Sequence, residues 1–517
     1  MLQKNNYKNS EGRLVMISKR GGNDMNRTNG WLIAASMISA LAVTTTASAT
    51  TGYFSLGYGA KSMGLAGAIV SNPQDAMAAS VNPAGMGMVG ERVDAGIEFF
   101  NPGDRSARLE TSAFGATYDV EDKSRRNLFF VPSLGYTSKI NDKLTWGISM
   151  YGNGGMNTTY DRNIYNEAAA VLGANGQGQQ AASMIPGVTP EQIQAAGKAA
   201  ASMVPEGTGA SDFAPIQDVN TLGVDLAQGI IAPTLSFKVH EKHMIGASLL
   251  IGIQRFSAYG LGNFQCFTKS VATNPANAAT CPNGYAAEPS NGLTNNGHDW
   301  AYGAGVRVGW IGEVLPKLSL GAAVASKVYM TEFDDYDELF AEDGKFDIPA
   351  NFTVGLTYKP TTALSLSFDF QRIYYEGVNS ISNAGPVFVP GVGPSIPPGG
   401  GLLGTDDGLG FGWEDINVYR IAADYRYNNE WNFRAGYSYN DQPIPDDQVL
   451  FNILAPATPK VHATVGFTYR PSNKSEWNFS YMHAFEEKVS SSQTAFGMPG
   501  EIKMRQNAVD LSYSYLF

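Results

Sequence analysis

Three arginines, Arg420, Arg426 and Arg434, are the side chains best placed for chemistry, because they alternate with aromatic residues in two adjacent segments. A strict period of two puts alternate side chains on opposite faces of a strand, so these guanidinium groups lie on its polar face. A guanidinium binds carboxylates, whether of a ligand or of the chain itself. Asp369 and Asp424 occupy similar polar positions, and we expect a structural ladder of ion pairs. Ligand binding by Arg420 and Arg434 is the alternative.

Catalytic and metal-binding chemistry has little material in this chain. It has five scattered histidines and two cysteines. A serine hydrolase needs a serine beside a histidine, and His462, on a clear polar register, has no such motif around it. The net charge of −11 argues against nucleic-acid binding, which needs a basic surface. We therefore expect no enzyme activity, no cofactor, no metal and no nucleic-acid partner.

The N-terminal region has the three parts of a secretory signal peptide. A short basic stretch (26–30) precedes a 13-residue apolar run, WLIAASMISALAV (31–43), and the small-residue site Ala47-Ser48-Ala49. We expect translation to start at Met25 and cleavage to follow Ala49. The apolar run is shorter than the about 20 residues that span a bilayer as a helix. The chain is therefore expected to be exported.

Alternating apolar and polar residues dominate the chain from Arg92 onward. Charged residues are only 16% of the chain, while Tyr and Phe number 25 and 26, which suits strands with one apolar and one polar face. The pattern predicts fourteen strands, at 92–101, 128–138, 143–151, 229–239, 243–255, 299–312, 317–332, 347–360, 363–375, 416–427, 430–440, 458–471, 475–488 and 504–517. An even number of strands is what bacterial outer-membrane barrels require.

The connections between these strands fall into two classes. Those after even-numbered strands are very short, as in KIND (139–142) and NN (428–429), whereas those after odd-numbered strands are long, above all 152–228, 256–298 and 376–415. Short turns at one rim and long loops at the other are typical of outer-membrane barrels, with the loops outside the cell. The sequence thus predicts an all-β, fourteen-stranded antiparallel transmembrane barrel over 92–517.

The last strand, AVDLSYSYLF, ends on the aromatic residue Phe517. We expect it to pair with the first strand and so close the barrel without leaving an edge. A terminal aromatic residue also resembles the signal that the bacterial barrel-assembly machinery recognises. Across the barrel, the apolar face of each strand is expected to contact lipid and the polar face to line the lumen.

Residues 50–91 contain no alternating strand and are rich in glycine, alanine and methionine. Their composition favours a compact hatch inside the barrel over a disordered leader. Asn72 and Pro73 read as the cap and first turn of a short helix that ends before Asn82 and Pro83. The expected domains are therefore a leader and signal peptide (1–49), a hatch with short helices (50–91) and the barrel.

The hatch segment SMGLAGAIVSNPQDAMAASVNPAGM resembles that of FadL/TodX-type outer-membrane transporters. The Asn-Pro-Ala of that family's hatch falls on Asn82, Pro83 and Ala84. The resemblance continues in FFVPSLGYTSKINDKLTWGIS and FDIPANFTVGLTYKPTTALSLSFDF. The chain departs from the family at 151–160, YGNGGMNTTY, where members usually carry a Pro-Phe-Gly-like turn. In the family this region lies near a strand kink through which the ligand is thought to leave sideways.

The resemblance implies passive uptake of hydrophobic small molecules, most simply long-chain fatty acids, through an apolar lumen pocket and a movable hatch. Aromatic or alkane hydrocarbons are the alternative ligands. The candidate ligand-binding residues are Tyr53 and Phe54, together with Arg420 and Arg434 if these two arginines bind a ligand and not the ladder of carboxylates. The expected partners are such a ligand, outer-membrane lipids, lipopolysaccharide and the barrel-assembly machinery, and the expected state is a monomer in the bacterial outer membrane.

Two alternatives of another class remain open at this point. One is a structural or adhesive outer-membrane protein or a plain porin, and the other is an outer-membrane lipase. Two features of the loops carry further expectations. Thr189, followed by Pro190 and Glu191, is a helix start, and Cys266 and Cys281 share one external loop, where we expect a disulfide.

Overall fold

A computed structural model describes residues 51–111, 118–204, 220–281, 286–390 and 392–517. The expected start at Met25 and the signal peptide lie outside these residues. Within the described residues, no helix has both the length and the apolar character needed to cross a membrane.

Fourteen long strands among the described residues form one closed antiparallel barrel, called the wall below. They are β1 (Arg92–Asn101), β4 (Phe129–Lys139), β5 (Leu144–Tyr160), β6 (Leu222–His240), β7 (His243–Tyr259), β8 (Asp299–Leu315), β9 (Leu318–Ala325), β11 (Asn351–Tyr358), β12 (Leu364–Ile373), β15 (Ile416–Arg426), β16 (Trp431–Asn440), β17 (Val461–Ser472), β18 (Ser475–Ser491) and β19 (Gly500–Leu516). Each pairs with its sequence neighbours in the wall. Pairing of β1 with β19, from Arg92–Leu516 to Asn101–Asn507, closes the ring.

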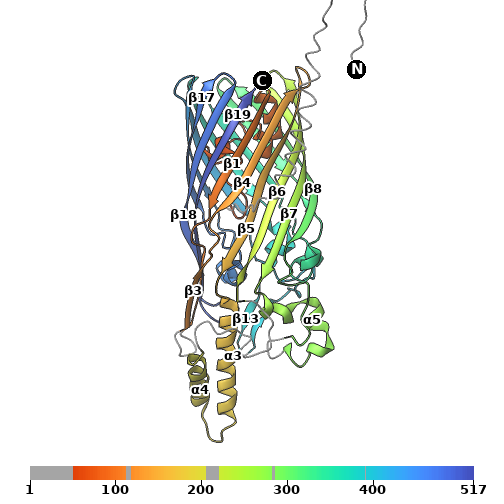
Figure 1. The fold of residues 1–517 in the computed structure, drawn as a ribbon, viewed down its shortest axis with the longest axis vertical. Helices are drawn as coiled ribbons and strands as arrows, with labels where there is room; N and C mark the ends of the chain where they lie inside the picture. Colours follow the sequence, from red (N-terminus) through yellow and green to blue (C-terminus); the bar gives the residue numbers. More distant parts are fainter. Residues whose placement is uncertain (1–50, 112–117, 205–219, 282–285, 391) are drawn as a thin grey trace, which may run out of the picture. The chain divides into compact units, whose positions relative to one another are not determined.

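The two ends of the barrel differ as the connection lengths predict. Figure 1 shows tight turns at the end marked C and longer, partly helical connections at the other end. Along the strands, alternate side chains face outward and inward. On β12, for example, Phe368 is exposed while Asp369 is buried. The predicted fold class and the assignment of apolar residues to the outer face are therefore confirmed.

Several predicted strand ends were wrong. β5 continues to Tyr160 and β6 begins at Leu222, so the long connection between them is shorter than 152–228. The predicted strand at 317–332 stops at Ala325, and a separate two-residue strand, β10 (Tyr329–Met330), pairs with β8. The break occurs where Val328 pairs with Ile348 of the following connection instead of continuing the ladder.

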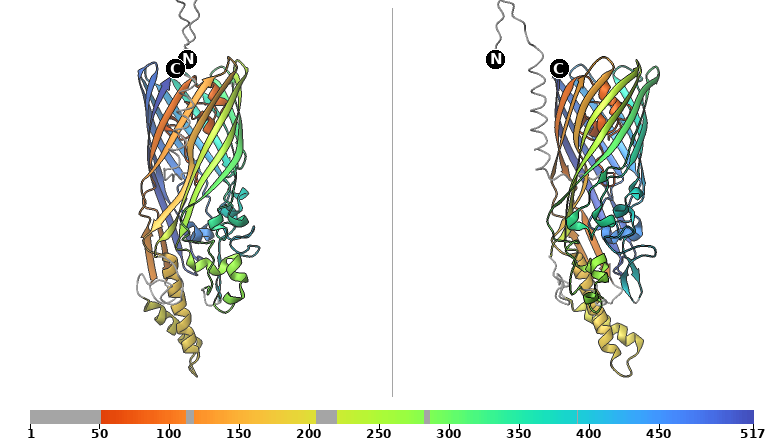
Figure 2. Two further views of the ribbon diagram at one scale, coloured as in Figure 1. Left: turned by 45° about the vertical axis from the view of Figure 1, so that its right-hand side comes forward. Right: turned by 90° about the vertical axis from the view of Figure 1, so that its right-hand side faces the viewer.

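The long connections contain secondary structure of their own. These elements are the hairpin β2 (Ser106–Thr111) and β3 (Tyr118–Lys123), the helices α3 (Ile164–Ser183), α4 (Pro190–Ser202), α5 (Lys269–Thr273), α6 (Ala341–Gly344), α7 (Asn379–Ser382) and α8 (Val449–Asn452), the 3₁₀ turns η4 (Gly262–Phe267), η5 (Pro275–Asn277), η7 (Asp334–Tyr336), η8 (Tyr375–Gly377) and η9 (Asp446–Gln448), and the hairpin β13 (Val387–Val389) and β14 (Gly393–Ser395). Figure 2 shows α3 and α4, in gold, reaching furthest from the barrel. As predicted, Thr189 caps α4, with Gln192 completing a capping box.

Cys266 and Cys281 lie in the connection between β7 and β8. Their sulfur atoms are bonded and their Cα atoms are 5.5 Å apart. The bond closes the part of the loop that contains α5 and η5.

Residues 51–91, called the hatch below, are almost entirely buried and lie against the wall's inner face. They contain α2 (Ala60–Met63), η1 (Ala78–Ser80) and η2 (Pro83–Met88). The helix expected to begin at Asn72 and end before Asn82 is absent, since only η1 forms within that stretch of the described chain. Wall side chains bind the backbone there: Asp94 accepts from Ala76 N–H at 2.9 Å, and Asp369 accepts from Val70 N–H just before it, also at 2.9 Å.

Candidate functional site

Hydrogen bonds from the inner wall hold the hatch at many points. Arg307 of β8 donates to the carbonyl oxygens of Ala79 (3.1 Å) and Ser80 (2.6 Å). Ser149 of β5 and Ser236 of β6 donate to other hatch carbonyls at 2.7 and 2.9 Å. A plug made of short turns has many unpaired backbone groups, and the polar lumen face of the wall satisfies them.

Asn82 bonds both to other parts of the hatch and to the wall. Its Nδ2 donates to the carbonyl oxygens of Val70 (2.8 Å) and of Trp310 on β8 (3.0 Å), while its Oδ1 accepts from Ala84 N–H (3.1 Å). The expectation that Asn82 and Pro83 follow a helix end was wrong, because Asn82 instead caps the start of η2 and Pro83 is its first residue. The Asn-Pro-Ala segment thus links two parts of the hatch to the wall.

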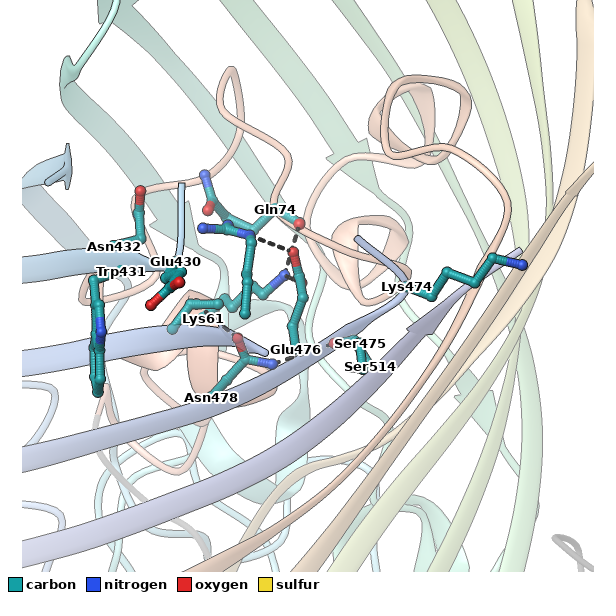
Figure 3. A network of polar contacts seen from close by, with 12 residues as sticks. Lys61, Gln74, Glu430, Trp431, Asn432, Lys474, Ser475, Glu476, Asn478 and Ser514 are labelled. Atoms are coloured by element: carbon teal, nitrogen blue, oxygen red, sulfur yellow. Dashed lines mark hydrogen bonds and ion pairs between the residues drawn. The ribbon is translucent and has the colours of Figure 1, made fainter. Parts of the chain in front are cut away.

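A buried charge network joins the hatch to the wall near the turn end. Lys61 of α2 forms an ion pair with Glu476 of β18, as Figure 3 shows. Glu476 also accepts from Arg92 of β1 (2.9 Å) and from Arg470 of β17 (2.8 Å). Burial lowers the pKa of the Lys61 ammonium, and nearby Arg92 lowers it further, whereas Glu476 opposes this shift.

The first described residues of the hatch lie in an aromatic cluster. The Tyr53 ring centroid is 5.2 Å from that of Phe54, 5.5 Å from that of Tyr375 and 6.0 Å from that of Trp413. The Tyr375 hydroxyl donates to Thr51 O (2.7 Å) and accepts from Tyr53 N–H (3.2 Å). Two of the expected ligand-binding residues therefore lie together, in an apolar part of the lumen.

Arg420 lies close to this cluster, in the wall of a small cavity of about 30 Å³ whose lining also includes Phe54 and Arg307. Its Nη2 donates to Gln371 Oε1 at 2.8 Å. Such a volume holds only one or a few water molecules, so little free space remains between the hatch and the wall here. Two guanidinium groups facing one cavity suit a small anion or an anionic headgroup.

The other arginines on this register differ from Arg420. Arg434 Nε lies 3.6 Å from Asp424 Oδ1, and its Nη1 donates to Thr468 at 2.8 Å, so it belongs to the expected structural ladder. Arg426 is exposed at the turn end of β15. The structure therefore separates Arg434 from the Tyr53 cluster, while it brings Arg420 close to Phe54.

An apolar pocket, called the outer pocket below, lies among the long connections. Its lining includes Phe256, Phe264, Phe340, Leu403 and Phe451, and its volume is about 30 Å³. The ring centroids of Phe256 and Phe340 are 4.7 Å apart. This pocket is small and is lined almost wholly by hydrocarbon.

Among the described residues, backbone pairing in the wall is interrupted between β4 and β5, next to the segment 151–160 that the resemblance associates with a strand kink. β4 and β5 pair from Lys139–Thr145 only as far as Ser133–Tyr151, although both strands continue toward the loop end. A bulge in β5 between Gly152 and Gly154 follows directly. We call the unpaired stretch beyond Tyr151 the wall gap.

At the wall gap, where β5 no longer pairs with β4, the first residues of the hatch form some of the missing backbone hydrogen bonds to β5. Ser55 N–H donates to Asn153 O (3.0 Å), and Gly155 N–H donates to Tyr53 O (3.2 Å). A Cβ on Gly154 would lie 1.9 Å from Tyr53 O, so only glycine permits this approach. The hatch is thus bonded to β5 at the wall gap.

Two functional features have weak sequence signals. Lys61 is a lone cation in an apolar segment. Such a residue, if buried, needs an anionic partner, but nothing in the sequence identifies Glu476 as that partner. Arg307 follows the alternating pattern of β8 and could have been grouped with the other lumen arginines. Among the described residues, no group of three or more histidine, cysteine, aspartate or glutamate side chains is arranged to hold a metal ion.

A closed fourteen-stranded barrel filled by an N-terminal hatch, with apolar pockets on its loop side, defines a class of outer-membrane transport protein. The family model described as "Outer membrane protein transport protein (OMPP1/FadL/TodX)" matches residues 39–174 and 205–517. The chain belongs to this family.

Individual relatives are distant. A long-chain fatty acid transport protein of Escherichia coli O6:H1 is 28% identical over 105 residues, which are 20% of this chain and 23% of that protein's length. The Pseudomonas putida toluene transporter TodX has a TM-score of 0.57 at 19% identity, covering 89% of this chain and 99% of TodX. A Pseudomonas aeruginosa FadL homologue has a TM-score of 0.55 at 14% identity, covering 90% of this chain and 99% of its own. These structures share the fold.

Proposed function

We propose that this protein takes up hydrophobic small molecules across the outer membrane by passive diffusion, with long-chain fatty acids as the principal substrates. The observation that carries the proposal is the bonding of the hatch segment Tyr53–Ser55 to β5 at the wall gap. If that segment moved, Tyr53 and Phe54 would leave the aromatic cluster. The same movement would open a path through the wall at the wall gap.

The proposed route begins at the outer pocket, which would expand to take an apolar molecule from outside. Burial of each methylene contributes about 0.8 kcal/mol, so a long alkyl chain is held without specific polar contacts. The molecule would then displace Tyr53 and Phe54 and leave through the wall gap toward the hydrocarbon of the membrane. No energy source is needed, because transfer follows the concentration gradient. No catalytic step is part of this route.

Fatty acids are favoured over neutral hydrocarbons by the pair Arg307 and Arg420 at the lumen cavity. A carboxylate there would replace weaker contacts to neutral oxygens with charge-assisted hydrogen bonds. Arg434, which pairs with Asp424, is better assigned to the structural ladder. Uptake of aromatic or alkane hydrocarbons remains the second candidate, supported by the apolar lining of the outer pocket.

Mass spectrometry of apolar molecules that co-purify with the detergent-extracted protein tests the substrate class. The proposal expects fatty acids with long alkyl chains. Uptake of labelled oleate and labelled toluene should then be compared in cells without another such channel. Faster uptake of toluene than of oleate, together with co-purified hydrocarbons, would favour the second candidate.

The proposal also places the protein as a monomer among outer-membrane lipids and lipopolysaccharide, with its long connections outside the cell. The barrel-assembly machinery is proposed to recognise Phe517 and the final strand. Export through a cleaved signal peptide is part of the same proposal.

A further inference from the structure

The wall gap contains a buried arginine that replaces the missing strand pairing. Arg105, in the connection after β1, donates through Nη1 to Asn157 O of β5 and through Nη2 to Arg126 O, just before β4. Its guanidinium carbon lies 5.8 Å from the ring centroid of Phe129, the first residue of β4. One side chain therefore bridges the two edges of the gap.

This guanidinium lacks the partner that a buried cation usually has. Arg105 is 2% exposed. Among the described residues its partners are neutral oxygens, and no carboxylate neutralises it. Burial lowers the pKa of Arg105 to about 10, so it stays charged at neutral pH. A desolvated cation held only by carbonyl groups is costly, and an anion would relieve that cost.

Two sets of polar atoms near Arg105 are unsatisfied. Within the described part of the chain, Arg105 Nε and both side-chain polar atoms of Asn157 are buried without a hydrogen-bond partner. Both residues line the same cavity of about 20 Å³. Two of these atoms, Arg105 Nε and Asn157 Nδ2, are donors at one cavity and fit an acceptor, because buried polar groups are otherwise almost always paired.

The rest of that cavity is apolar, with Phe100, Met156, Ala455 and Met504 in its lining. A site with a cation and an amide at one point and hydrocarbon elsewhere suits an amphipathic acid. A neutral hydrocarbon would leave both polar groups unsatisfied, and a small inorganic anion would not use the apolar lining.

We propose that Arg105 and Asn157 form a carboxylate-binding subsite at the wall gap, specific for long-chain fatty acids at the point of exit. The carboxylate pairs with the Nε edge of Arg105, and the guanidinium gives up its bonds to Asn157 O and Arg126 O. Binding of the carboxylate therefore also breaks the hydrogen bonds by which Arg105 joins the two edges of the wall gap. This inference rests on the proposed function and deepens it.

The test is equilibrium binding of radiolabelled hexadecanoate and of its neutral methyl ester to the purified full chain. Arg105→Ala should weaken hexadecanoate binding about tenfold, as expected for a lost hydrogen-bonded charge, and change ester binding less than twofold. Asn157→Leu should weaken acid binding about threefold, and Arg105→Lys should remain within threefold of the unmodified protein. Arg125→Ala, a surface arginine that pairs with exposed Asp161, is the matched control and should change neither.

Heat-modifiable migration in gels checks that each variant is a folded barrel. If Arg105→Ala does not fold, the two separate variants Arg105→Lys and Asn157→Leu are used for the test. Equal weakening of acid and ester by the Arg105 and Asn157 variants would make Arg105 a structural bridge and overturn the subsite. No change in either would mean that the cavity holds only water and would also overturn it. In both cases ester binding by the unmodified protein would leave the proposed function intact, whereas failure to bind either ligand would refute both proposals.

Discussion

Lys61 of the hatch and Glu476 of β18 form an ion pair whose side chains are 2% and 7% exposed, across the boundary between plug and wall. Arg92 and Arg470 bind the same carboxylate from two other strands. One glutamate therefore holds the hatch and three wall strands together at the turn end, opposite the wall gap. The hatch is anchored at that end, and its first residues are bonded to β5 at the gap.

Replacing Glu476 with glutamine is predicted to loosen the hatch without unfolding the barrel. Removal of one partner from a buried pair leaves an uncompensated charge and costs about 3–5 kcal/mol. Liposome swelling should show faster entry of small sugars than with the unmodified protein. Glu313→Gln is the control, since Glu313 pairs with Lys242 at an exposed position. Unchanged sugar entry with Glu476→Gln would show that the network does not seat the hatch.

Replacing Asn82 and Pro83 with alanine is predicted to leave a correctly inserted, heat-modifiable barrel but to impair uptake of a long-chain fatty acid or an alkylbenzene. The loss of Asn82 leaves the Val70 and Trp310 carbonyls without that donor, at a cost of about 1–3 kcal/mol. Asn72→Ala should have a smaller effect, because Asn72 Nδ2 makes one long bond, 3.3 Å, to Ser367. Normal uptake by the double variant at unmodified surface levels would contradict a role for the Asn-Pro-Ala segment in transport.

Gly154→Ala is predicted to push the hatch segment off β5. The new Cβ would meet Tyr53 O at 1.9 Å, a contact that backbone atoms cannot accommodate without moving. Fatty-acid uptake should change several-fold while the barrel stays folded. Gly173→Ala on α3, where nothing lies within 4 Å, is the matched control and should be neutral. Identical uptake by both variants would remove the proposed role of this contact.

The Cys266–Cys281 disulfide is predicted to be present in protein isolated without reductant. In the chain-entropy model a loop of this size contributes about 3 kcal/mol, here acting on the connection between β7 and β8 and not on the barrel. Thiol titration after denaturation should therefore find no free cysteine, and reduction should speed proteolysis of that loop while the barrel keeps its heat-modifiable migration. Two free thiols per chain would show that the bond does not form in the cell.

The barrel was predictable from sequence because each strand carries its own signal. Tyr419, Ile421 and Tyr425 alternate with Arg420 and Ala422 whatever their neighbours are, and membrane and lumen impose that alternation on every wall strand. Strand ends were less predictable. The extension of β5 to Tyr160 depends on pairing with β6, a contact with no local signature in its glycine-rich and polar residues.

The internal structure of the hatch and the contacts that fill the wall gap could not be predicted from local sequence, because they depend on residues far away in the chain. Asn72-Pro73 and Asp75 form a plausible helix start, yet Asp94 and Asp369 bind the backbone nearby and leave only a short 3₁₀ turn. Likewise, Tyr53 and Phe54 could be assigned to the ligand site by resemblance, whereas Arg105 looks like any loop arginine. Its burial follows only from the place where β4 and β5 separate.

The central claim, passive transfer of hydrophobic molecules through a barrel closed to polar solutes, is tested most directly by comparing two fluxes in liposomes that contain the purified protein. Long-chain fatty acid is expected to enter rapidly and saturably, and sugar is expected to enter no faster than in protein-free liposomes. Sugar entry at porin-like rates with no acceleration of fatty-acid entry would contradict the claim.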